Sequence, residues 1–411
     1  MTKTIAIAQE VPWLGGDWFD PLEAGVRRRI RSFIEGMLEE ELAAALGRGR
    51  YDRSPGAAGY RNGHRDRQLL GTFGPVAVSV PRARRSGGDG KPEEWRSKTL
   101  PAYKRLTGRA EALIAGAYLA GTNTRRVRRA LSALFAGAVG KDTVSRVWRK
   151  VQSDWEAWQK RDLAGESIVR LILDGTVVKV RLDRKATSLS VLVALGVRRD
   201  GQKVLLALRN MGGESEAAWR ALLDDLVTRG LGVPELLIPA FAGTSGAAGL
   251  EKALAGLWPE VPVQRCTVHK HRNLLAHAPR KLCDEVSADD TDMIYATTAR
   301  EVAARRKAFL RKWRQRCKPV ADSLEEAGEK LFTFLRLPPG QWRAIRTTNA
   351  IERLHEEFKR RIKTQCLLPC AETACMLFWA LLASGQITLR KVDGWQTLHV
   401  EPANQQLDHA A

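Results

Sequence analysis

The chain lacks any segment that could cross a membrane or direct export. Its most apolar stretch, Ala374 to Ala383, is shorter than the ~20 residues that a membrane-spanning helix needs and is typical of a buried helix. Residues 1–17 do not combine a basic start with an apolar run, so we expect no signal peptide. These absences favour a cytoplasmic protein.

Cysteine is scarce and unevenly placed. All six cysteines follow residue 260, and their irregular spacing does not form the framework of a disulfide-stapled domain. Free thiols of this kind suit a reducing compartment, which again favours the cytoplasm.

Acidic residues are few relative to basic ones. The chain of 411 residues has 67 Lys and Arg against 46 Asp and Glu, a formal charge of +21. Such an excess attracts polyanions but says nothing about the fold. We expect nucleic acid as the first candidate partner. An anionic membrane surface is a weaker second candidate, and we expect no membrane association.

The first hundred residues predict a helix followed by a β-hairpin. Apolar side chains recur at helical spacing over residues 19–47, which indicates an amphipathic helix. Residues 68–81 alternate around Phe73-Gly74-Pro75 and predict a hairpin. We assign residues 1–100 to this N-terminal region.

Residues 101–163 are helical and basic. A helix capped within Gly121 to Thr124 bears four arginines, and a second helix begins near Asp142 after a glycine-containing break. This pattern resembles a helix-turn-helix, whose second helix enters the major groove. A helical bundle with a solvated arginine face fits the spacing equally well, and the net charge favours DNA binding. The candidate DNA-binding residues are Arg125, Arg126, Arg128, Arg129 and Arg146.

From residue 167 the pattern becomes α/β. Three consecutive predicted strands are followed by helix, strand, helix and strand, the order of a ribonuclease H-like core. The strands span residues 168–173, 177–182, 189–197, 235–238 and 261–265, and the helices 214–229 and 247–257. We assign residues 164–400 to this core, with a polar helical insertion at about 267–340, and residues 401–411 to a tail.

Two carboxylates stand where phosphoryl-transfer chemistry would need them. Asp174 follows the first predicted strand, so it would lie at the rim of the sheet. Glu352 would face the same rim from the first turn of a basic helix. Each has a plain structural alternative: an Asp174-Gly175 hairpin turn, or a capping box of Asn349 with Glu352. Taken singly, these alternatives are favoured. Farther along that helix, the candidate DNA-backbone contacts are Lys359, Arg360 and Arg361.

Cys266 and His269 have the spacing of half a zinc site. A closed structural site needs four ligands, usually from a second close pair, and no such pair follows. The sequence therefore predicts a buried, hydrogen-bonded Cys/His pair at a strand–helix junction.

In order along the chain, these pieces resemble the Mutator-type transposases of bacterial insertion sequences. The resemblance extends from about residue 20 to 395. It is highly specific because its matching segments occur in the same order as in the family. The matching segments are Tyr60-Arg61-Asn62-Gly63-His64, Val80-Pro81-Arg82, Leu173-Asp174-Gly175, Gln264-Arg265-Cys266-Thr267-Val268-His269, Arg272-Asn273-Leu274-Leu275 and Thr347-Thr348-Asn349-Ala350-Ile351-Glu352-Arg353.

The resemblance implies a DDE transposase, in which three carboxylates hold Mg²⁺ or Mn²⁺ for DNA strand cleavage and transfer. Asp174 would be the first carboxylate and Glu352 the third, both as metal ligands, with Cys266 and His269 as an accessory pair. The implied partners are double-stranded DNA, at terminal inverted repeats and target sites, and further copies of the chain. Such a protein would act in the cytoplasm, at the nucleoid.

The chain departs from the family at the second carboxylate. Ser245 aligns with the expected Asp, after an apparent insertion from Pro239 to Thr244. A neutral hydroxyl cannot replace an anionic ligand of Mg²⁺. The alternative function is therefore a catalytically defective relic that only binds DNA. A general basic nucleic-acid binder is a third hypothesis, which the ordered α/β pattern disfavours.

Overall fold

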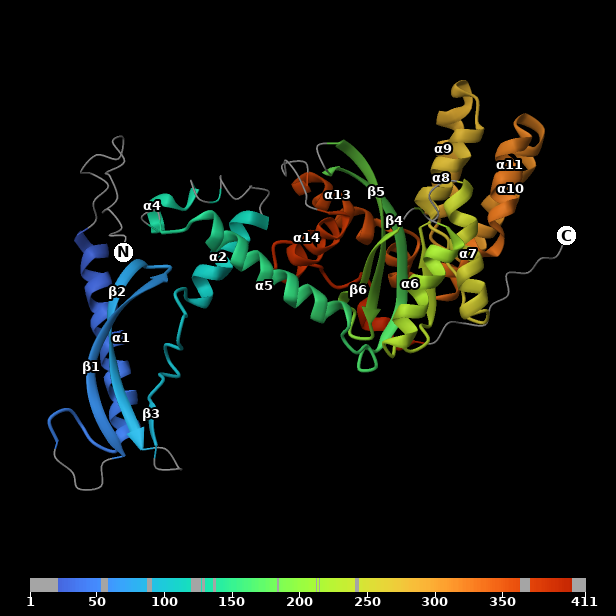
Figure 1. Cartoon of the computed structure of the whole chain (residues 1–411). Helices are drawn as coiled ribbons and strands as arrows, with labels where there is room; N and C mark the ends of the chain where they lie inside the picture. Colours follow the sequence, from blue (N-terminus) through green and yellow to red (C-terminus); the bar gives the residue numbers. More distant parts are fainter. Residues whose placement is uncertain are drawn as a thin grey trace. The chain divides into compact units, whose positions relative to one another are not determined.

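In a computed structural model the chain divides into two units, residues 1–151 and 152–411 (Figure 1). The structure describes residues 21–400 apart from 53–57, 87–90, 120–126, 128–129, 136–137, 183–184, 212, 214, 241–243 and 363–369. The finer division predicted at residues 100, 163 and 400 stays a prediction, and the predicted tail lies outside the described residues.

The first unit begins with the predicted helix and hairpin. Helix α1 (Pro21–Leu46) packs on a three-stranded antiparallel sheet of β1 (Gly59–Gly71), β2 (Gly74–Ser86) and β3 (Pro92–Glu94). Alternate apolar side chains of β2 turn toward the helix, as the period of a strand requires. Leu38 of α1 and Val78 of β2 are both fully buried there. The helix and hairpin predictions are confirmed.

A small helical core completes the first unit. Helices α2 (Gly108–Leu119), α4 (Ser132–Phe135) and α5 (Lys141–Gln159) enclose Ile114, Phe135 and Val144. Helix α5 contains the predicted second helix, and it continues into the second unit. The helix-turn-helix remains a prediction, because residues 121–126 and 128–129, with the four arginines of the first helix, lie outside the described residues.

A four-stranded sheet of order β6-β5-β4-β7 forms the centre of the second unit. Strands β4 (Ile168–Leu182), β5 (Lys185–Arg198) and β6 (Lys203–Met211) are antiparallel, and β7 (Leu236–Pro239) runs parallel to β4. Helices α6 (Glu216–Thr228) and α7 (Thr244–Leu257) pack against it. The predicted α/β class is confirmed.

Three strand predictions need correction. The two runs predicted at 168–173 and 177–182 form the single strand β4, because Gly175 stays in register with Leu192 and makes no turn. Strand β6 was not predicted. The strand predicted at 261–265 is reduced to one parallel bridge, Val263 to Leu237.

The two faces of β4 have different neighbours. Leu171 and Leu173 point into the apolar core with Trp219 of α6 and Leu250 of α7. Since side chains alternate along a strand, Asp174 points to the opposite face. Helix α13 (Asn349–Ile362) packs against β4, and α14 (Ala371–Ala383) packs against β6 (Figure 1).

The predicted polar helical stretch is confirmed and extends slightly farther. It comprises α8 (Thr267–His277), α9 (Cys283–Ile294), α10 (Ala299–Arg316), α11 (Lys318–Ala327) and α12 (Pro339–Ile345), with short 3₁₀ turns at Arg280–Leu282, Gly328–Leu331 and Thr333–Arg336, and a last one at Trp395–Thr397. Helix α14 is the expected buried apolar helix, with every residue from Thr373 to Leu381 buried. No helix in the described part of the chain is long and apolar enough to cross a membrane.

Candidate active site

Asp174 lies within β4, not at a strand end as predicted. Its backbone pairs with Val193 of β5, and its side chain is buried. On the other side, β7 ends at Pro239, opposite Leu173. The parallel pair therefore stops one residue before Asp174. This places Asp174 at the carboxyl edge of the parallel strands, where open α/β sheets bind ligands.

Glu352 lies in the first turn of α13, whose start is tied to α8. The amide of Glu352 donates to the carbonyl of Thr348, and the amide of Thr267 donates to the carbonyl of Arg346. The capping-box alternative required a bond from Glu352 back to the backbone of Asn349. Asn349 is itself the first residue of the helix, and Glu352 Oε1 is buried without a hydrogen-bond partner among the described residues.

His355, one turn beyond Glu352, reaches Asp174 directly. Its Nδ1 lies 3.2 Å from Asp174 Oδ2, and about 5% of each side chain is exposed. The imidazole also packs edge to face against the ring of Phe378 in α14. This contact joins α13 to the centre of β4 and brings the Glu352 turn to the Asp174 edge.

Cys266, His269 and Glu352 form one cluster. Cys266 precedes α8 and is buried, as predicted, and His269 lies in the first turn of that helix. One ligand atom from each of the three side chains lies within 4.8 Å of the others. His269 Nε2 is 3.5 Å from Glu352 Oε1, and Arg272 Nη1 approaches the same oxygen at 3.8 Å.

The charges of this cluster favour an ion pair. Burial opposes the Cys266 thiolate, but hydrogen bonds with His269 and Thr348 outweigh it, so the pKa of Cys266 lies below its ordinary value. Burial likewise opposes a charged His269. The hydrogen bond to Cys266 and the negative charges of Cys266, Glu352 and Asp174 raise the pKa of His269 nonetheless. His269 thus lies in the field of both candidate carboxylates.

The position of the second carboxylate is only partly described. Ser245 lies in the first turn of α7, and its side chain is outside the described set. Pro239 belongs to β7, and the amide of Ala240 donates to the carbonyl of Leu173 at 2.7 Å. Pro239 is the last residue of β7 and Ala240 directly follows it, whereas residues 241–243 lie outside the described residues, so the insertion from Pro239 to Thr244 stays a prediction.

The comparisons with known proteins decide the family. Residues 20–388 match the family described as "Transposase, Mutator family". The chain belongs to this family. It is 32% identical over 357 residues to the transposase for insertion sequence element ISRM5 of Rhizobium meliloti (strain 1021), covering 87% of this chain and 86% of that protein.

Two further relatives are more distant. The transposase for IS905 of Lactococcus lactis subsp. lactis (strain IL1403) is 30% identical over 84% of this chain and 85% of its own length. The transposase for IS256 in transposon Tn4001 of Staphylococcus aureus is 26% identical over 86% and 88%. The predicted Mutator-family membership is confirmed.

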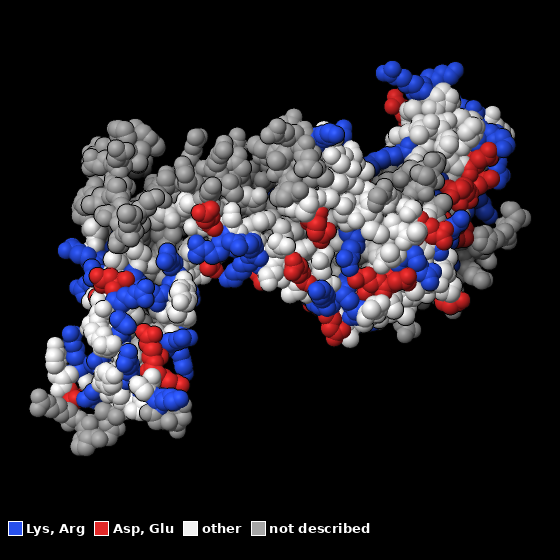
Figure 2. Space-filling view, in the orientation of Figure 1, with Lys and Arg blue, Asp and Glu red and all other residues white. Residues whose placement is uncertain are grey.

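The described DNA-binding candidates of this Mutator-family chain differ in accessibility. Arg146 is exposed on α5, beside exposed Arg149, and Figure 2 shows Lys and Arg gathered over α2 and α5. Arg360 and Arg361 of α13 both bond to Glu357, and only 18% of the Arg361 side chain is exposed. Lys359 is half-buried.

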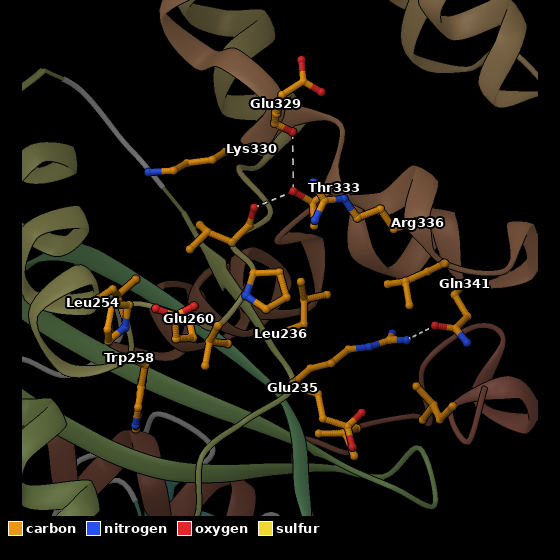
Figure 3. Close-up of a pocket in the computed structure, with 18 of the residues that line it drawn as sticks. Glu235, Leu236, Leu254, Trp258, Glu260, Glu329, Lys330, Thr333, Arg336 and Gln341 are labelled. Atoms are coloured by element: carbon orange, nitrogen blue, oxygen red, sulfur yellow. Dashed lines mark hydrogen bonds between the residues drawn. The ribbon is translucent and has the colours of Figure 1, made fainter. Parts of the chain in front are cut away.

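A cleft of about 850 Å³ lies at the opposite end of β4 and β7 (Figure 3). Within its lining Arg170 donates to the side-chain oxygen of Gln341, and Thr333 donates to the carbonyl of Val263. Four acidic and four basic side chains line it, together with His399. Three of the acids are paired: Glu235 with Arg199, Glu251 with Lys330 and Glu329 with Arg306. None of the predicted site residues lines this cleft, and its balanced charge does not suit a DNA backbone.

Sequence reasoning missed His355, and it assigned no role to Thr348 or Arg272, although both stand in segments that carry the family resemblance. His355 could have been found, because residues three apart share a helix face and His355 stands three after Glu352. The spacing of Thr348 does not reveal that its Oγ1 donates to Cys266 Sγ at 3.3 Å.

Proposed function

We propose that this chain is an insertion-sequence transposase that binds terminal inverted repeats and cleaves and transfers DNA strands at Asp174 and Glu352. The contact between His355 and Asp174 carries the proposal. It brings together, from β4 and α13, the two carboxylates to which the family resemblance assigns the chemistry. Strand transfer at two DNA ends needs at least two active sites, so the proposal includes a homo-oligomer.

A ribonuclease H-like core is part of this proposal. The strand order β6-β5-β4-β7, with the Val263 bridge outside β7, supports it. Helices α8 to α12 would then be the insertion between the second and third carboxylate positions.

The two carboxylates fit Mg²⁺ or Mn²⁺. Mg²⁺ is usually bound through one or two carboxylates together with water and substrate phosphates. Glu352 Oε1, buried and without a hydrogen-bond partner in the described part of the chain, is an oxygen that a cation would satisfy. When bound, the ion would activate the attacking oxygen and neutralise charge on the phosphate.

The chain's own residues would position this chemistry. His355 holds the Asp174 carboxylate in one orientation on the rigid centre of the sheet. Arg272 is 62% exposed beside Glu352, so its guanidinium could bind a phosphate of the DNA backbone. Exposed Arg146 on α5 would contribute to duplex binding in the first unit.

A defective relic that binds DNA without cleaving it is the second candidate. The observation that favours it is the end of β7, where Pro239 and Ala240 are followed by Phe241 and not by an acid. Three clustered carboxylates would then be reduced to two, and two-metal catalysis would lose one of its ligands.

Metal-dependent cleavage of labelled DNA that carries the element's own ends separates these functions. The wild-type chain is compared with Glu352→Ala and with Glu356→Ala, an exposed glutamate on the same helix. The transposase is supported if the wild-type chain and Glu356→Ala cleave the DNA and Glu352→Ala does not. Binding of the ends without cleavage supports the relic, and failure to bind them overturns both.

A repaired variant sharpens the test. It lacks residues 241–244 and carries Ser245→Asp, so that the new carboxylate directly follows Ala240 while Pro239 keeps its pairing with Leu173. If the relic proposal holds, this variant gains Mg²⁺-dependent cleavage. The same deletion without Ser245→Asp is the control and should remain inactive.

A further inference from the structure

The cluster at the start of α8 contains ligands that a Mg²⁺ site does not use. Cys266 offers sulfur and His269 offers nitrogen, whereas Mg²⁺ takes oxygen. Thiolate, imidazole and carboxylate together are the donor set of Zn²⁺ and similar transition metals. The sequence showed only half of such a site, and the fold supplies the third ligand, Glu352, from α13.

We propose that Cys266, His269 and Glu352 bind one Zn²⁺-type ion in a three-ligand site with an open fourth position. Metal–ligand bonds of ~2.0–2.3 Å in a tetrahedron separate neighbouring ligand atoms by ~3.5 Å. His269 Nε2 and Glu352 Oε1 are 3.5 Å apart, and the whole set lies within 4.8 Å. Small side-chain rotations therefore suffice to close the site.

The surroundings are built for metal ligands rather than for a packed core. Glu352 Oε1 is buried and lacks a hydrogen-bond partner among the described residues, and a bound metal ion would satisfy it. The hydroxyl of Thr348 donates to Cys266 Sγ, and a donor of this kind would hold a ligating thiolate in place. Arg272 Nη1 lies 3.8 Å from Glu352 Oε1, and because 62% of its side chain is exposed it can turn to solvent.

The site has a consequence that rests on the proposed function. Glu352 has only two carboxylate oxygens. A Zn²⁺-type ion beside Cys266 would take at least one of them, which a catalytic Mg²⁺ at the Asp174 edge could then not use. A Zn²⁺-type ion would therefore compete with Mg²⁺ for Glu352 and slow strand cleavage, so the site would act as an inhibitory metal sensor.

Cobalt substitution tests the site independently of catalysis. The full-length chain, stripped of metal, is titrated with Co²⁺ and followed by absorption spectroscopy. We expect one equivalent to bind with a near-ultraviolet sulfur-to-cobalt band and the visible bands of a four-coordinate ion, both displaced by Zn²⁺. Cys266→Ala should remove the sulfur band, and Glu352→Gln should weaken Co²⁺ binding about tenfold or more.

Cys283→Ala is the matched control, because Cys283 lies outside the cluster near the carbonyls of Leu275 and Ala278. Its sulfur band should equal that of wild type. Absence of the band in wild type, or its survival in Cys266→Ala, overturns the proposal.

X-ray absorption of the Zn²⁺-loaded wild-type chain covers the case in which a variant fails to fold. One sulfur at about 2.3 Å with nitrogen and oxygen at about 2.0–2.2 Å supports the site. A shell without sulfur, or with several sulfurs, contradicts it. A cobalt band without DNA cleavage would support the metal site and contradict the proposed transposase activity. DNA cleavage without a cobalt band would support the transposase activity and contradict the metal site.

Discussion

His355 Nδ1 lies 3.2 Å from Asp174 Oδ2 in an environment that excludes almost all water from both side chains. A buried carboxylate requires a donor, since removing one from water without a partner costs several kcal/mol. The Nδ1–H of His355 is the donor that the geometry provides, and the ring is fixed from behind by Phe378. Stability and site geometry therefore depend on the same contact.

We predict that replacing His355 destabilises the chain through Asp174. His355→Phe keeps a ring against Phe378 but leaves the carboxylate without its donor, so the free energy of unfolding should fall by about 1–3 kcal/mol. His355→Asn retains an amide donor near the position of Nδ1 and should lose less. Urea denaturation at pH 7 measures both.

A double-mutant cycle controls this prediction. With Asp174→Ala as background, the loss caused by His355→Phe should shrink, giving a coupling energy of about 1–2 kcal/mol. Equal losses in both backgrounds would show that packing against Phe378, and not the contact with Asp174, is what His355 contributes.

Local patterns predicted the elements better than the site. Periodicity of the apolar residues predicted three elements. The helix at residues 19–47 and the hairpin each bury one face, and the helix near Ala374 is apolar on all sides. Asp174-Gly175 misled the prediction, since Asp-Gly usually marks a turn. In β4 the pairing of Gly175 with Leu192 overrides that preference, and a single sequence does not reveal cross-strand register.

The site itself depends on contacts that no local pattern encodes. The C-x2-H spacing of Cys266 and His269 pointed to a special pair, and Asp174 and Glu352 were found through the family resemblance. That Glu352 completes the Cys266 cluster, while His355 serves Asp174, follows only from how α13 packs on β4. Pro239 shows what a local rule can predict, because proline was expected to end its strand and β7 does end there.

The pair of Glu166 and Arg198 predicts a pH-dependent stability. Arg198 donates to both oxygens of Glu166, at 2.6 and 2.9 Å, and these bonds lower the pKa of Glu166. A depressed carboxyl pKa stabilises the fold above the ordinary glutamate value of 4.5, and this contribution is lost as the pH falls below it. The pair is partly exposed, so it should be worth about 1 kcal/mol or less.

Thermal unfolding of Glu166→Gln tests this. The variant should melt below wild type at pH 7, and the difference should narrow as the pH drops below 4.5. Glu260→Gln, at an exposed glutamate of the same unit, should show no such difference at either pH. A gap that stays constant with pH would mean that the charge of Glu166 is not responsible.

Gly201 should tolerate no side chain. It closes the turn between β5 and β6 with a φ of +83°, and an added Cβ would lie 2.3 Å from Cβ of Trp395. Gly201→Ala combines left-handed strain with this clash, so we expect a loss of about 1–3 kcal/mol in unfolding free energy. Gly232→Ala, where nothing lies within 4 Å, is the control and should change little. Similar melting temperatures for the two variants would contradict the prediction.

DNA affinity should respond unequally to loss of the basic candidates. Each phosphate contact releases counterions, so removing one reduces the slope of log affinity against log salt by about 1. Arg146 is exposed on α5, and Arg146→Ala should weaken duplex binding and lower this slope. Arg361 bonds to the carboxylate and the backbone carbonyl of Glu357, so Arg361→Ala should leave the slope nearly unchanged.

Fluorescence anisotropy titrations at several salt concentrations measure the affinity and the salt slope of both variants, with circular dichroism to verify folding. An unchanged slope in Arg146→Ala would remove α5 from the DNA-binding surface and favour the plain helical-bundle interpretation of residues 101–163.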